Sequence, residues 1–400
     1  MNIHRTLTTT LVERTRDYRV TFLTGPRQSG KTTLARSAFP DAAYRSFEDP
    51  SVRRRAADDP RGFLDGLAQE RGVILDEVQH LPDIFSYLQG YVDEGRGGPY
   101  ILTGSQNFLL SERISQSLAG RAAVLELLPF SIAELRGRPA RSLDQLIDSA
   151  PEGGAVDTPM DLDAAMFAGG FPPVHDRGLD PRVWFDSYLR TYVERDVRLV
   201  AGIGDLDAFA RFVSLCAGRS GSLLNLTSLG ADAGVSHTTA RKWISVLRAT
   251  YVIDVALVHA ANFSKRLVKT PKLYFLDTGL LCSLLELRGP KDLVSHPLRG
   301  AIFETMVYTE LHKMATHHGE RSRLAFWRDA QGNEVDFVIE RSGRLFPIEA
   351  KSGRTVVPES FRGLEYFSRL SGQPGGLLVY GGEESIGHRG FGVRPWSQLS

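Results

Sequence analysis

The chain has 400 residues, of which 42% are hydrophobic and 24% are charged, and its formal net charge is +1. These values are typical of a globular protein with roughly two to four domains, and they give no overall sign of a nucleic-acid binder. No run reaches the ~18 apolar residues of a transmembrane helix, and the two cysteines, Cys216 and Cys282, lie far apart. We therefore expect a cytoplasmic protein without a membrane partner, a disulfide framework or a zinc cluster, in which any metal has oxygen ligands.

Residues 1–135 alternate short apolar runs with segments of helical length. The runs are "YRVTFLT", "RGVILDE", "PYILTGS" and "AAVLELL". This alternation predicts an α/β domain with a parallel sheet and helical crossovers.

The first apolar run leads into "LTGPRQSGKTT", a full G-x-x-x-x-G-K-[ST] match followed by a helical pattern. Such a P-loop presents backbone N–H groups and a helix N-terminus to phosphates, which predicts ATP and Mg²⁺ as cofactors. Lys31 is expected to contact the β- and γ-phosphates, and the Thr32 hydroxyl to bind the magnesium ion. The predicted nucleotide-binding residues of the loop are Gly25, Pro26, Arg27, Gln28, Ser29, Gly30, Lys31, Thr32 and Thr33.

Acidic and polar residues follow the next strands. Asp76 and Glu77 end the strand "GVILDE", where a P-loop sheet supplies one acid to magnesium and a second acid to water. Ser105, after the third strand, either senses the γ-phosphate or makes a turn. Arg121, before the fourth, is either an arginine finger, in its own chain or in a homo-oligomer, or a structural ion pair.

The sequence predicts five segments. They are a P-loop ATPase domain (1–136), a linker rich in Gly, Pro, Ser and Asp (137–160), a helical connector (161–204), a winged-helix module (205–288) and a C-terminal α/β domain (289–400). In the connector, Pro181 is placed to start a helix over 181–200, and 167–200 is our hypothesis for the element that couples the domains.

Residues 224–253 have the pattern of a helix-turn-helix. Gly234 is expected to make the turn, Ser236 to cap the second helix, and apolar residues recur at helical spacing behind them. Basic residues also exceed acidic ones by five between 205 and 275. We expect DNA binding here, with a spacer or protein-docking module as the alternative. The predicted nucleic-acid contacts are His237, Thr238, Arg241, Lys242, Lys265, Arg266 and Lys269.

"EVDFVIERSGRLFPIEAK" (334–351) predicts a β-hairpin. Either a two-residue turn at Ser342-Gly343 or a four-residue loop over "RSGR" places Asp336 opposite Glu349, and Val335 and Phe337 together on the reverse face. Opposed acids repel unless a cation lies between them, so Mg²⁺ or Mn²⁺ is expected, with Lys351 beside the developing charge. The helix before the hairpin carries Glu304 and Glu310, either of which can complete the acidic pocket. The alternative is a surface hairpin with ordinary salt bridges.

The chain resembles a bacterial and archaeal family of AAA+-like P-loop ATPases along nearly its whole length. The resemblance rests on "TGPRQSGKTTL", "ILDEVQ", "ILTGSQ", "SLAGR", "FAGGFP", "LYFLDTGLL", "GAIFETMVYTEL" and "GNEVDFVI…PIEAK". It implies a C-terminal half with a winged helix and a restriction-endonuclease-like fold. The last motif resembles the PD-(D/E)xK nuclease pattern, which implies catalytic roles for Asp336, Glu349 and Lys351, and Glu304 matches the helical acid of the family.

Together these features predict an ATPase coupled to a DNA-binding half that cleaves DNA with a bound metal. The rival hypothesis is a nucleotide-gated docking switch whose nuclease-like domain is catalytically silent.

Overall fold

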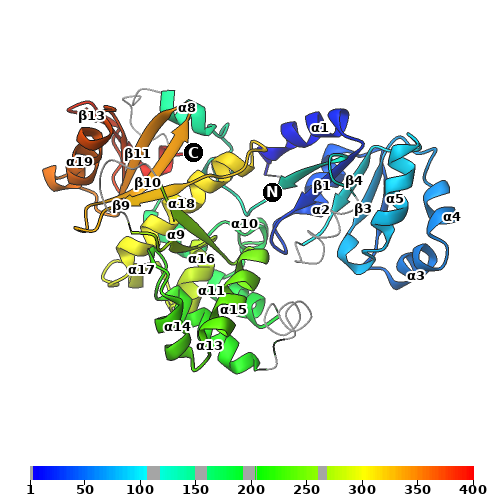
Figure 1. Ribbon diagram of the computed structural model, residues 1–400, viewed down its shortest axis with the longest axis horizontal. Helices are drawn as coiled ribbons and strands as arrows, with labels where there is room; N and C mark the ends of the chain where they lie inside the picture. The colour runs from blue at the N-terminus through cyan, green and yellow to red at the C-terminus, as the bar shows by residue number, and fades with distance from the viewer. Residues whose placement is uncertain (1–2, 106–117, 149–159, 192–202, 204, 260–267) are drawn as a thin grey trace. The chain divides into compact units, whose positions relative to one another are not determined.

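The computed structural model describes residues 3–105, 118–148, 160–191, 203, 205–259 and 268–400 (Figure 1). Contacts divide the chain into two units, which we describe separately. The first comprises residues 1–130 with 249–251 and 316–320, and the second comprises the rest. Within the described ranges, every helix is too short or too polar to span a lipid bilayer.

The first unit contains a five-stranded sheet in which every strand is parallel to its neighbours, in the order β2-β3-β4-β1-β5. Its strands are β1 (Val20–Thr24), β2 (Ala43–Ser46), β3 (Val73–Asp76), β4 (Tyr100–Thr103) and β5 (Ala122–Glu126). Its helices are α1 (Leu7–Asp17), α2 (Lys31–Ala38), α3 (Pro50–Asp58), α4 (Pro60–Asp65), η1 (Val78–His80) and α5 (Ile84–Asp93). The predicted parallel sheet with helical crossovers is confirmed.

Helices cover both faces of this sheet (Figure 1). Phe22 and Leu75 face α3, α4 and α5, whereas Leu23 faces α1 and α2. Successive strand residues point to opposite faces, so a strand covered on both sides is buried at every position, which is why β1, β3 and β4 are fully buried and mostly apolar.

The second unit combines many helices with a larger sheet. The helices are α7 (Ile132–Leu135), α8 (Leu143–Asp148), α9 (Leu162–Ala168), α10 (Pro172–Asp176), α11 (Pro181–Thr191), α13 (Leu206–Ala217), α14 (Leu226–Ala233), α15 (His237–Ala249), α16 (Thr278–Leu284), α17 (Pro290–Leu293), α18 (Arg299–Thr316), η3 (Pro358–Phe361), α19 (Arg362–Ser371) and η4 (Trp396–Gln398). The strands are β6 (Ser222–Leu223), β7 (Ile253–Val258), β8 (Lys272–Phe275), β9 (Ala325–Arg328), β10 (Glu334–Arg341), β11 (Arg344–Lys351), β12 (Leu377–Tyr380), β13 (Ile386–His388) and β14 (Phe391–Pro395).

Several local predictions in this unit are confirmed. Pro181 begins α11, although residues 192–200 of the predicted helix lie outside the described residues. Gly234 ends α14 with a positive φ of 76°, and the Ser236 hydroxyl accepts a hydrogen bond from the Thr239 N–H (3.1 Å) at the start of α15. The predicted linker is partly helical, because it contains α8.

The nine strands form one sheet in the order β13-β14-β12-β11-β10-β9-β7-β8-β6. Strands from the predicted segments 205–288 and 289–400 meet where β7 runs parallel to β9. Leu257 lies opposite Ala325, and Val258 lies opposite Phe326. The strands of the predicted winged-helix module and those of the C-terminal segment, which the sequence analysis separates at residue 288, therefore belong to one sheet.

The hairpin of β10 and β11 has the predicted register. Phe337 pairs with Ile348 and Arg341 with Arg344, around a two-residue turn in which Ser342 and Gly343 both have positive φ. The predicted faces are wrong in part. Against β9, the register of β10 shifts by one residue between Val335 and Val338, so both valines pack toward α19 while Phe337 contacts Tyr274 and Tyr308.

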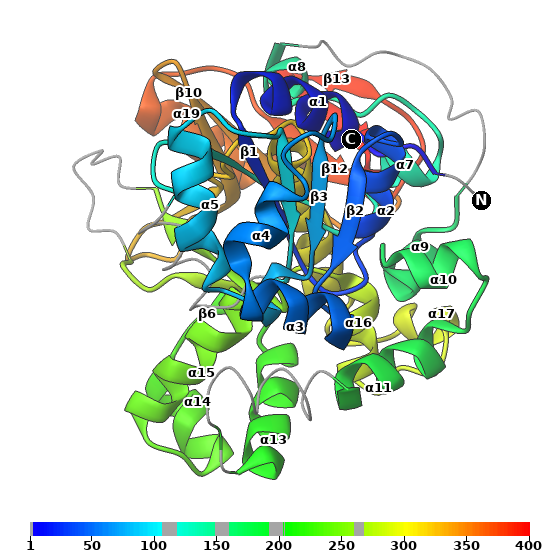
Figure 2. The same cartoon turned by 90° about the vertical axis from the view of Figure 1, so that its right-hand side faces the viewer.

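One buried carboxylate fixes the helices around α16. The Asp277 side chain accepts hydrogen bonds from the N–H groups of Leu280 (3.0 Å) and Gly170 (2.8 Å), which joins "FAGGFP" to "LDTGLL". α9 and α11 accordingly pack on α16 (Figure 2). Gly169 has φ of 63°, and a Cβ there would overlap the Asp277 carboxylate.

This contact gives a stability prediction for Gly169→Ala. We expect the free energy of unfolding to fall by about 3 kcal/mol or more, because backbone strain adds to a clash with a buried carboxylate. Gly178→Ala is the matched control, since Gly178 also has a positive φ (60°) but open space around it, and we expect it to cost about 1–2 kcal/mol. Urea unfolding measures both, and equal losses would contradict the role of the Asp277 contact.

Candidate functional site

The P-loop lies between β1 and α2. Gly25 (φ 143°) and Gly30 (φ 94°) adopt conformations that favour glycine, and a Cβ on Gly25 would overlap the Leu127 carbonyl. Lys31 is 5% exposed, and its Nζ donates to the carbonyls of Gly25 (3.1 Å) and Pro26 (2.7 Å). Burial lowers the pKa of Lys31 to about 8, against the opposing effect of the two acids that follow β3. The ammonium is thus held over the loop where phosphates are expected.

Asp76, at the end of β3, accepts hydrogen bonds from three hydroxyl groups. They belong to Thr32 (2.8 Å), Tyr44 (2.7 Å) and Thr103. Burial and the bond to Asp76 raise the pKa of Tyr44 to about 12. Because Thr32 and Asp76 touch, the predicted pair of hard oxygen ligands is in place and fits a magnesium ion. Tyr44 and Thr103 are residues that the sequence analysis missed.

Glu77 has a positive φ of 56°, which is uncommon for a glutamate. Its carboxylate accepts a hydrogen bond from Gln79, whose amide also reaches the Ser105 hydroxyl (3.3 Å). The structure therefore brings the two predicted residues, Glu77 and Ser105, together through Gln79. The sequence analysis quoted Gln79 within "ILDEVQ" but gave it no role.

Arg121 does not lie at this end of the sheet. It directly precedes β5, whose first residue pairs with Val20 at the start of β1, whereas the P-loop follows the far end of β1. Along the five residues of β1, the start of β5 and the P-loop are therefore about 16 Å apart, at ~3.3 Å per residue. Arg121 instead makes a bidentate ion pair with Asp93 (2.5 and 3.0 Å). The structure therefore shows Arg121 in an ion pair, which was one of the predicted alternatives, at the end of β1 opposite to the P-loop.

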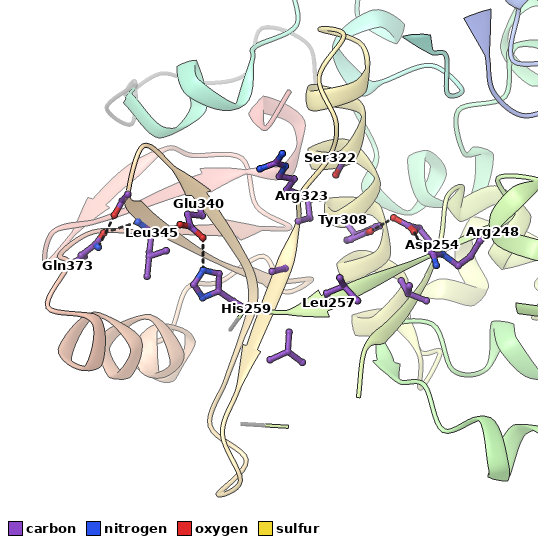
Figure 3. A pocket seen from close by; sticks show the side chains of 15 residues that line it. Arg248, Asp254, Leu257, His259, Tyr308, Ser322, Arg323, Glu340, Leu345 and Gln373 are labelled. Atoms are coloured by element: carbon purple, nitrogen blue, oxygen red, sulfur yellow. Dashed lines mark hydrogen bonds and ion pairs between the residues drawn. The ribbon is translucent and has the colours of Figure 1, made fainter. Parts of the chain in front are cut away.

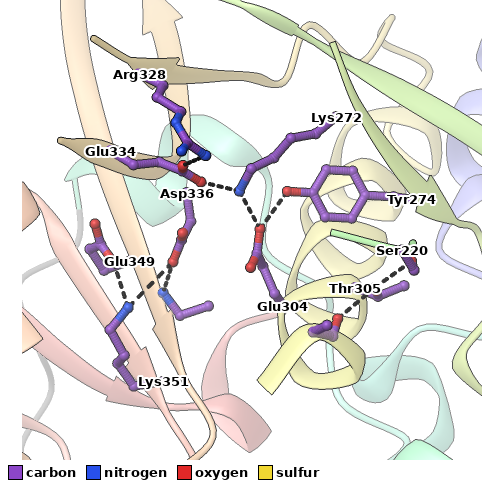
Figure 4. Close-up of polar contacts among 12 residues, drawn as sticks. Ser220, Lys272, Tyr274, Glu304, Thr305, Arg328, Glu334, Asp336, Glu349 and Lys351 are labelled. Carbon is purple, nitrogen blue, oxygen red and sulfur yellow. Dashed lines mark hydrogen bonds and ion pairs between the residues drawn. The ribbon is translucent and has the colours of Figure 1, made fainter. Parts of the chain in front are cut away.

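A second set of charged side chains gathers in the C-terminal sheet (Figure 4). The carboxylates are Glu304 from α18, Glu334 and Asp336 from β10, and Glu349 from β11, and the cations are Lys272 from β8, Arg328 from β9 and Lys351 from β11. We call these seven residues the acidic cluster. The four residues predicted from the nuclease-like motif all belong to it.

Asp336 lies where the hairpin strands stop pairing. Its Oδ2 accepts a hydrogen bond from the Ala350 N–H (2.9 Å) and lies 3.7 Å from the Lys351 ammonium, which in turn bonds Glu349 (2.8 Å). The Lys351 ammonium thus lies beside both opposed acids, and a Cβ on Gly363 of α19 would overlap Glu349 Oε1. Burial, followed by the Asp336 charge, raises the pKa of Glu349 well above its usual range.

Glu304 faces the other side of Asp336. Its Oε1 accepts hydrogen bonds from the Lys272 ammonium (2.8 Å) and the Tyr274 hydroxyl (2.6 Å). Burial, with a contribution from Asp336, raises the pKa of Glu304 to about 7 despite the opposing Lys272 charge. Of the two acids that the sequence left open, Glu304 joins the cluster. Glu310 instead accepts from the Ile132 N–H (2.8 Å) and pairs with Lys313.

The ligand atoms of the acidic cluster fit a divalent cation. Carboxylate oxygens of Glu304, Glu334 and Asp336 all lie within 4.8 Å of one another. Oxygen ligands of this kind are those that Mg²⁺ and Mn²⁺ prefer. Glu334, Arg328 and Lys272 were not predicted to belong to the acidic cluster. Arg328 and Lys272 come from strands outside the hairpin, so the hairpin pattern gives no sign of them.

The predicted nucleic-acid contacts on α15 are exposed. His237, Thr238, Arg241 and Lys242 all lie on its outward face, and the apolar residues behind them are buried. Lys269 is also exposed, whereas Lys265 and Arg266 lie outside the described residues.

A cleft of about 760 Å³ opens where β7 and β9 meet (Figure 3). Polar contacts that line it include the His259–Glu340 pair (3.1 Å) and the Tyr308 hydroxyl bonded to Asp254 (2.7 Å). The predicted site residues do not line this cleft, so it is distinct from the acidic cluster.

Three stretches of the chain match known domain families. Residues 17–136 match the AAA domain, residues 160–291 a domain of unknown function (DUF8612), and residues 299–399 a second domain of unknown function (DUF4143). With the P-loop geometry above, the N-terminal unit is an AAA-type P-loop ATPase domain.

Two proteins show how widely the likeness extends. A protein of Methanocaldococcus jannaschii, MJ1544, is 21% identical over 331 residues, covering 79% of this chain and 70% of its own. Among solved structures, the Walker-type ATPase PABY2304 of Pyrococcus abyssi aligns with a TM-score of 0.45 and 15% identity, over 70% of this chain and 94% of its own.

Two mycobacterial proteins match more strongly. The uncharacterised protein Rv2008c of Mycobacterium tuberculosis and its counterpart Mb2031c of Mycobacterium bovis are each 31% identical over 351 residues, which is 86% of this chain and 72% of theirs. The chain belongs to the same family as these two proteins.

Proposed function

We propose that ATP binding and hydrolysis in the N-terminal unit control a DNA-binding half that carries a metal-dependent, nuclease-type site. The observation that carries the nuclease part is the acidic cluster, in which four carboxylates face three cations. Crowded, partly buried carboxylates repel one another, and a divalent cation relieves the repulsion.

In the ATPase site, each residue has a role that its contacts support. Lys31 binds the β- and γ-phosphates, and Thr32 with Asp76 holds Mg²⁺. Glu77 polarises the attacking water, while Gln79 and Ser105 position its carboxylate. The other P-loop residues supply backbone N–H groups to the phosphates.

In the C-terminal half, we propose a winged helix followed by a restriction-endonuclease-like domain. A bound Mg²⁺ or Mn²⁺ supplies a Lewis acid and an activated water to phosphodiester hydrolysis. Asp336, Glu304 and Glu349 bind or orient that ion, and Lys351 lies beside Asp336 where negative charge develops. Exposed Arg241 and Lys242 on α15, with Lys269, contact the DNA backbone or bases.

A second candidate function is a nucleotide-gated docking switch with a silent nuclease-like domain. The ion pairs made by Lys272, Lys351 and Arg328 favour it, since these cations already neutralise most of the carboxylate charge. The two candidates differ in whether Asp336 and Glu349 matter for cleavage of DNA.

For the ATPase, we expect Glu77→Gln to lower the hydrolysis rate by roughly 10²–10⁴-fold while ATP still binds, because only the water-polarising carboxylate is lost. Lys31→Ala should weaken nucleotide binding itself. Phosphate release and binding of a fluorescent ATP analogue measure the two effects. Glu70→Gln, an exposed acid of the same unit, is the control. Normal turnover by Glu77→Gln would contradict this role.

For the nuclease-type site, the full chain should cut supercoiled or single-stranded DNA with Mg²⁺ or Mn²⁺. Asp336→Asn and Glu349→Gln should each lower cutting by about 100-fold or more, because a metal-binding or metal-orienting charge is lost. ATP hydrolysis should persist in both variants. Glu340→Gln, on the same strand as Asp336 but outside the cluster, should cut normally.

The same assay separates the two candidate functions. Wild-type protein that leaves DNA intact with every metal and nucleotide tested would favour the docking switch. Cutting that persists in Asp336→Asn would place the activity elsewhere or in a contaminant.

For DNA binding, removing both Arg241 and Lys242 should lower affinity and reduce the slope of log K against log salt by about 2, one for each lost phosphate contact. Fluorescence anisotropy over a salt series measures this slope. As the control, Arg288→Gln with Lys291→Gln removes the same amount of charge from exposed positions outside α15. This variant should leave the slope of log K against log salt unchanged. An unaltered slope in the Arg241 and Lys242 variant would argue against α15 as the contact surface.

A further inference from the structure

The most deeply buried cation of the acidic cluster comes from outside the nuclease-like segment. Lys272 is the first residue of β8, a strand of the winged-helix module, and it is only 3% exposed. Its ammonium makes ion pairs with Glu304 (2.8 Å) and with Glu334 (Figure 4). The strand is held between β6 and β7, so Lys272 reaches the cluster from a fixed backbone.

The partners of Lys272 are also the residues that fit a metal. Glu304 and Glu334 belong, with Asp336, to the group whose oxygens lie within 4.8 Å of one another. An ammonium and a divalent ion that use the same oxygens compete, since each needs the carboxylates at hydrogen-bonding or coordination distance.

Charge balance leads to the same conclusion. When all four carboxylates of the cluster are ionised, they face three cations, Lys272, Lys351 and Arg328, which leaves one negative charge. Adding a divalent ion while Lys272 stays would leave the site with net positive charge and like charges a few ångströms apart. With Lys272 displaced, the same ion balances the carboxylates completely. The metal-bound and lysine-bound arrangements are therefore alternatives.

We propose that Lys272 is an internal cation that occupies the metal position of the acidic cluster and must leave before Mg²⁺ or Mn²⁺ binds. This inference rests on the proposed nuclease-type site and adds its regulation. The winged-helix module thereby contributes directly to the control of the catalytic group, because the competing charge is on its own strand.

Mn²⁺ binding to the nucleotide-free full chain tests the proposal. Titration calorimetry or the electron paramagnetic resonance of free Mn²⁺ gives the affinity without any need for turnover. We expect Lys272→Met to bind Mn²⁺ on the order of tenfold or more tightly than wild type, since a like charge has been removed from beside the ion. Lys291→Met, at an exposed position of α17, should match wild type. Asp336→Asn should abolish the binding in either background.

Thermal unfolding provides a second readout. Without metal, Lys272→Met leaves carboxylates uncompensated and should melt several degrees below wild type, and Mn²⁺ should restore most of that loss. Lys272→Gln removes the charge but keeps a hydrogen-bond donor for Glu304 and leaves all three metal-fitting carboxylates in place, so it keeps the test valid if Lys272→Met folds poorly.

The outcomes separate the two proposals. If wild type and Lys272→Met bind Mn²⁺ equally well in a manner that depends on Asp336, the metal site stands and the competing role of Lys272 is wrong. If wild type, Lys272→Met and Lys272→Gln all fail to bind, the metal site itself is wrong.

Discussion

A carboxylate withdrawn from water is stable only where a cation or hydrogen-bond donors face it, and this requirement organises both units of the protein. Asp76 meets it with three hydroxyl groups, Asp277 with the N–H groups of two chain segments, and Glu310 with one N–H and one lysine. In each case one acid has enough partners. At Asp277 and Glu310 these partners hold the fold together without a further ion.

The acidic cluster differs because its acids outnumber its cations. Raised pKa values at Glu304 and Glu349 follow from burial and from the Asp336 charge beside them. Lysine side chains supply two of the three compensating charges. Because these side chains are long and flexible, their ammonium groups can move away from a metal ion while the backbone moves little.

Whether the sequence predicts a contact depends on how far apart its residues lie along the chain. The β10–β11 register was predictable because a two-residue turn determines which residues face each other, and the P-loop because one contiguous motif contains it. β2, "AYRS", was missed because an edge strand with half-buried residues has no apolar run. Lys272 was missed as a cluster member because the pairing of β7 with β9 joins residues that are distant in the sequence. The β10 bulge also leaves no local pattern, yet it decides which face Phe337 occupies.

The placement of Lys272 also links it to a segment far away in the chain. Asp277 lies two residues beyond β8 and accepts the Gly170 N–H, so the "FAGGFP" segment is tied to the end of the strand that carries Lys272. Moving that segment requires either that β8 moves with it or that a buried hydrogen bond to a carboxylate breaks, at a cost of about 1–3 kcal/mol. That cost is comparable with the few kcal/mol by which a ligand's differential affinity shifts a two-state equilibrium. The bond between Gly170 and Asp277 is therefore strong enough to transmit a movement to Lys272 and weak enough to break if β8 stays in place.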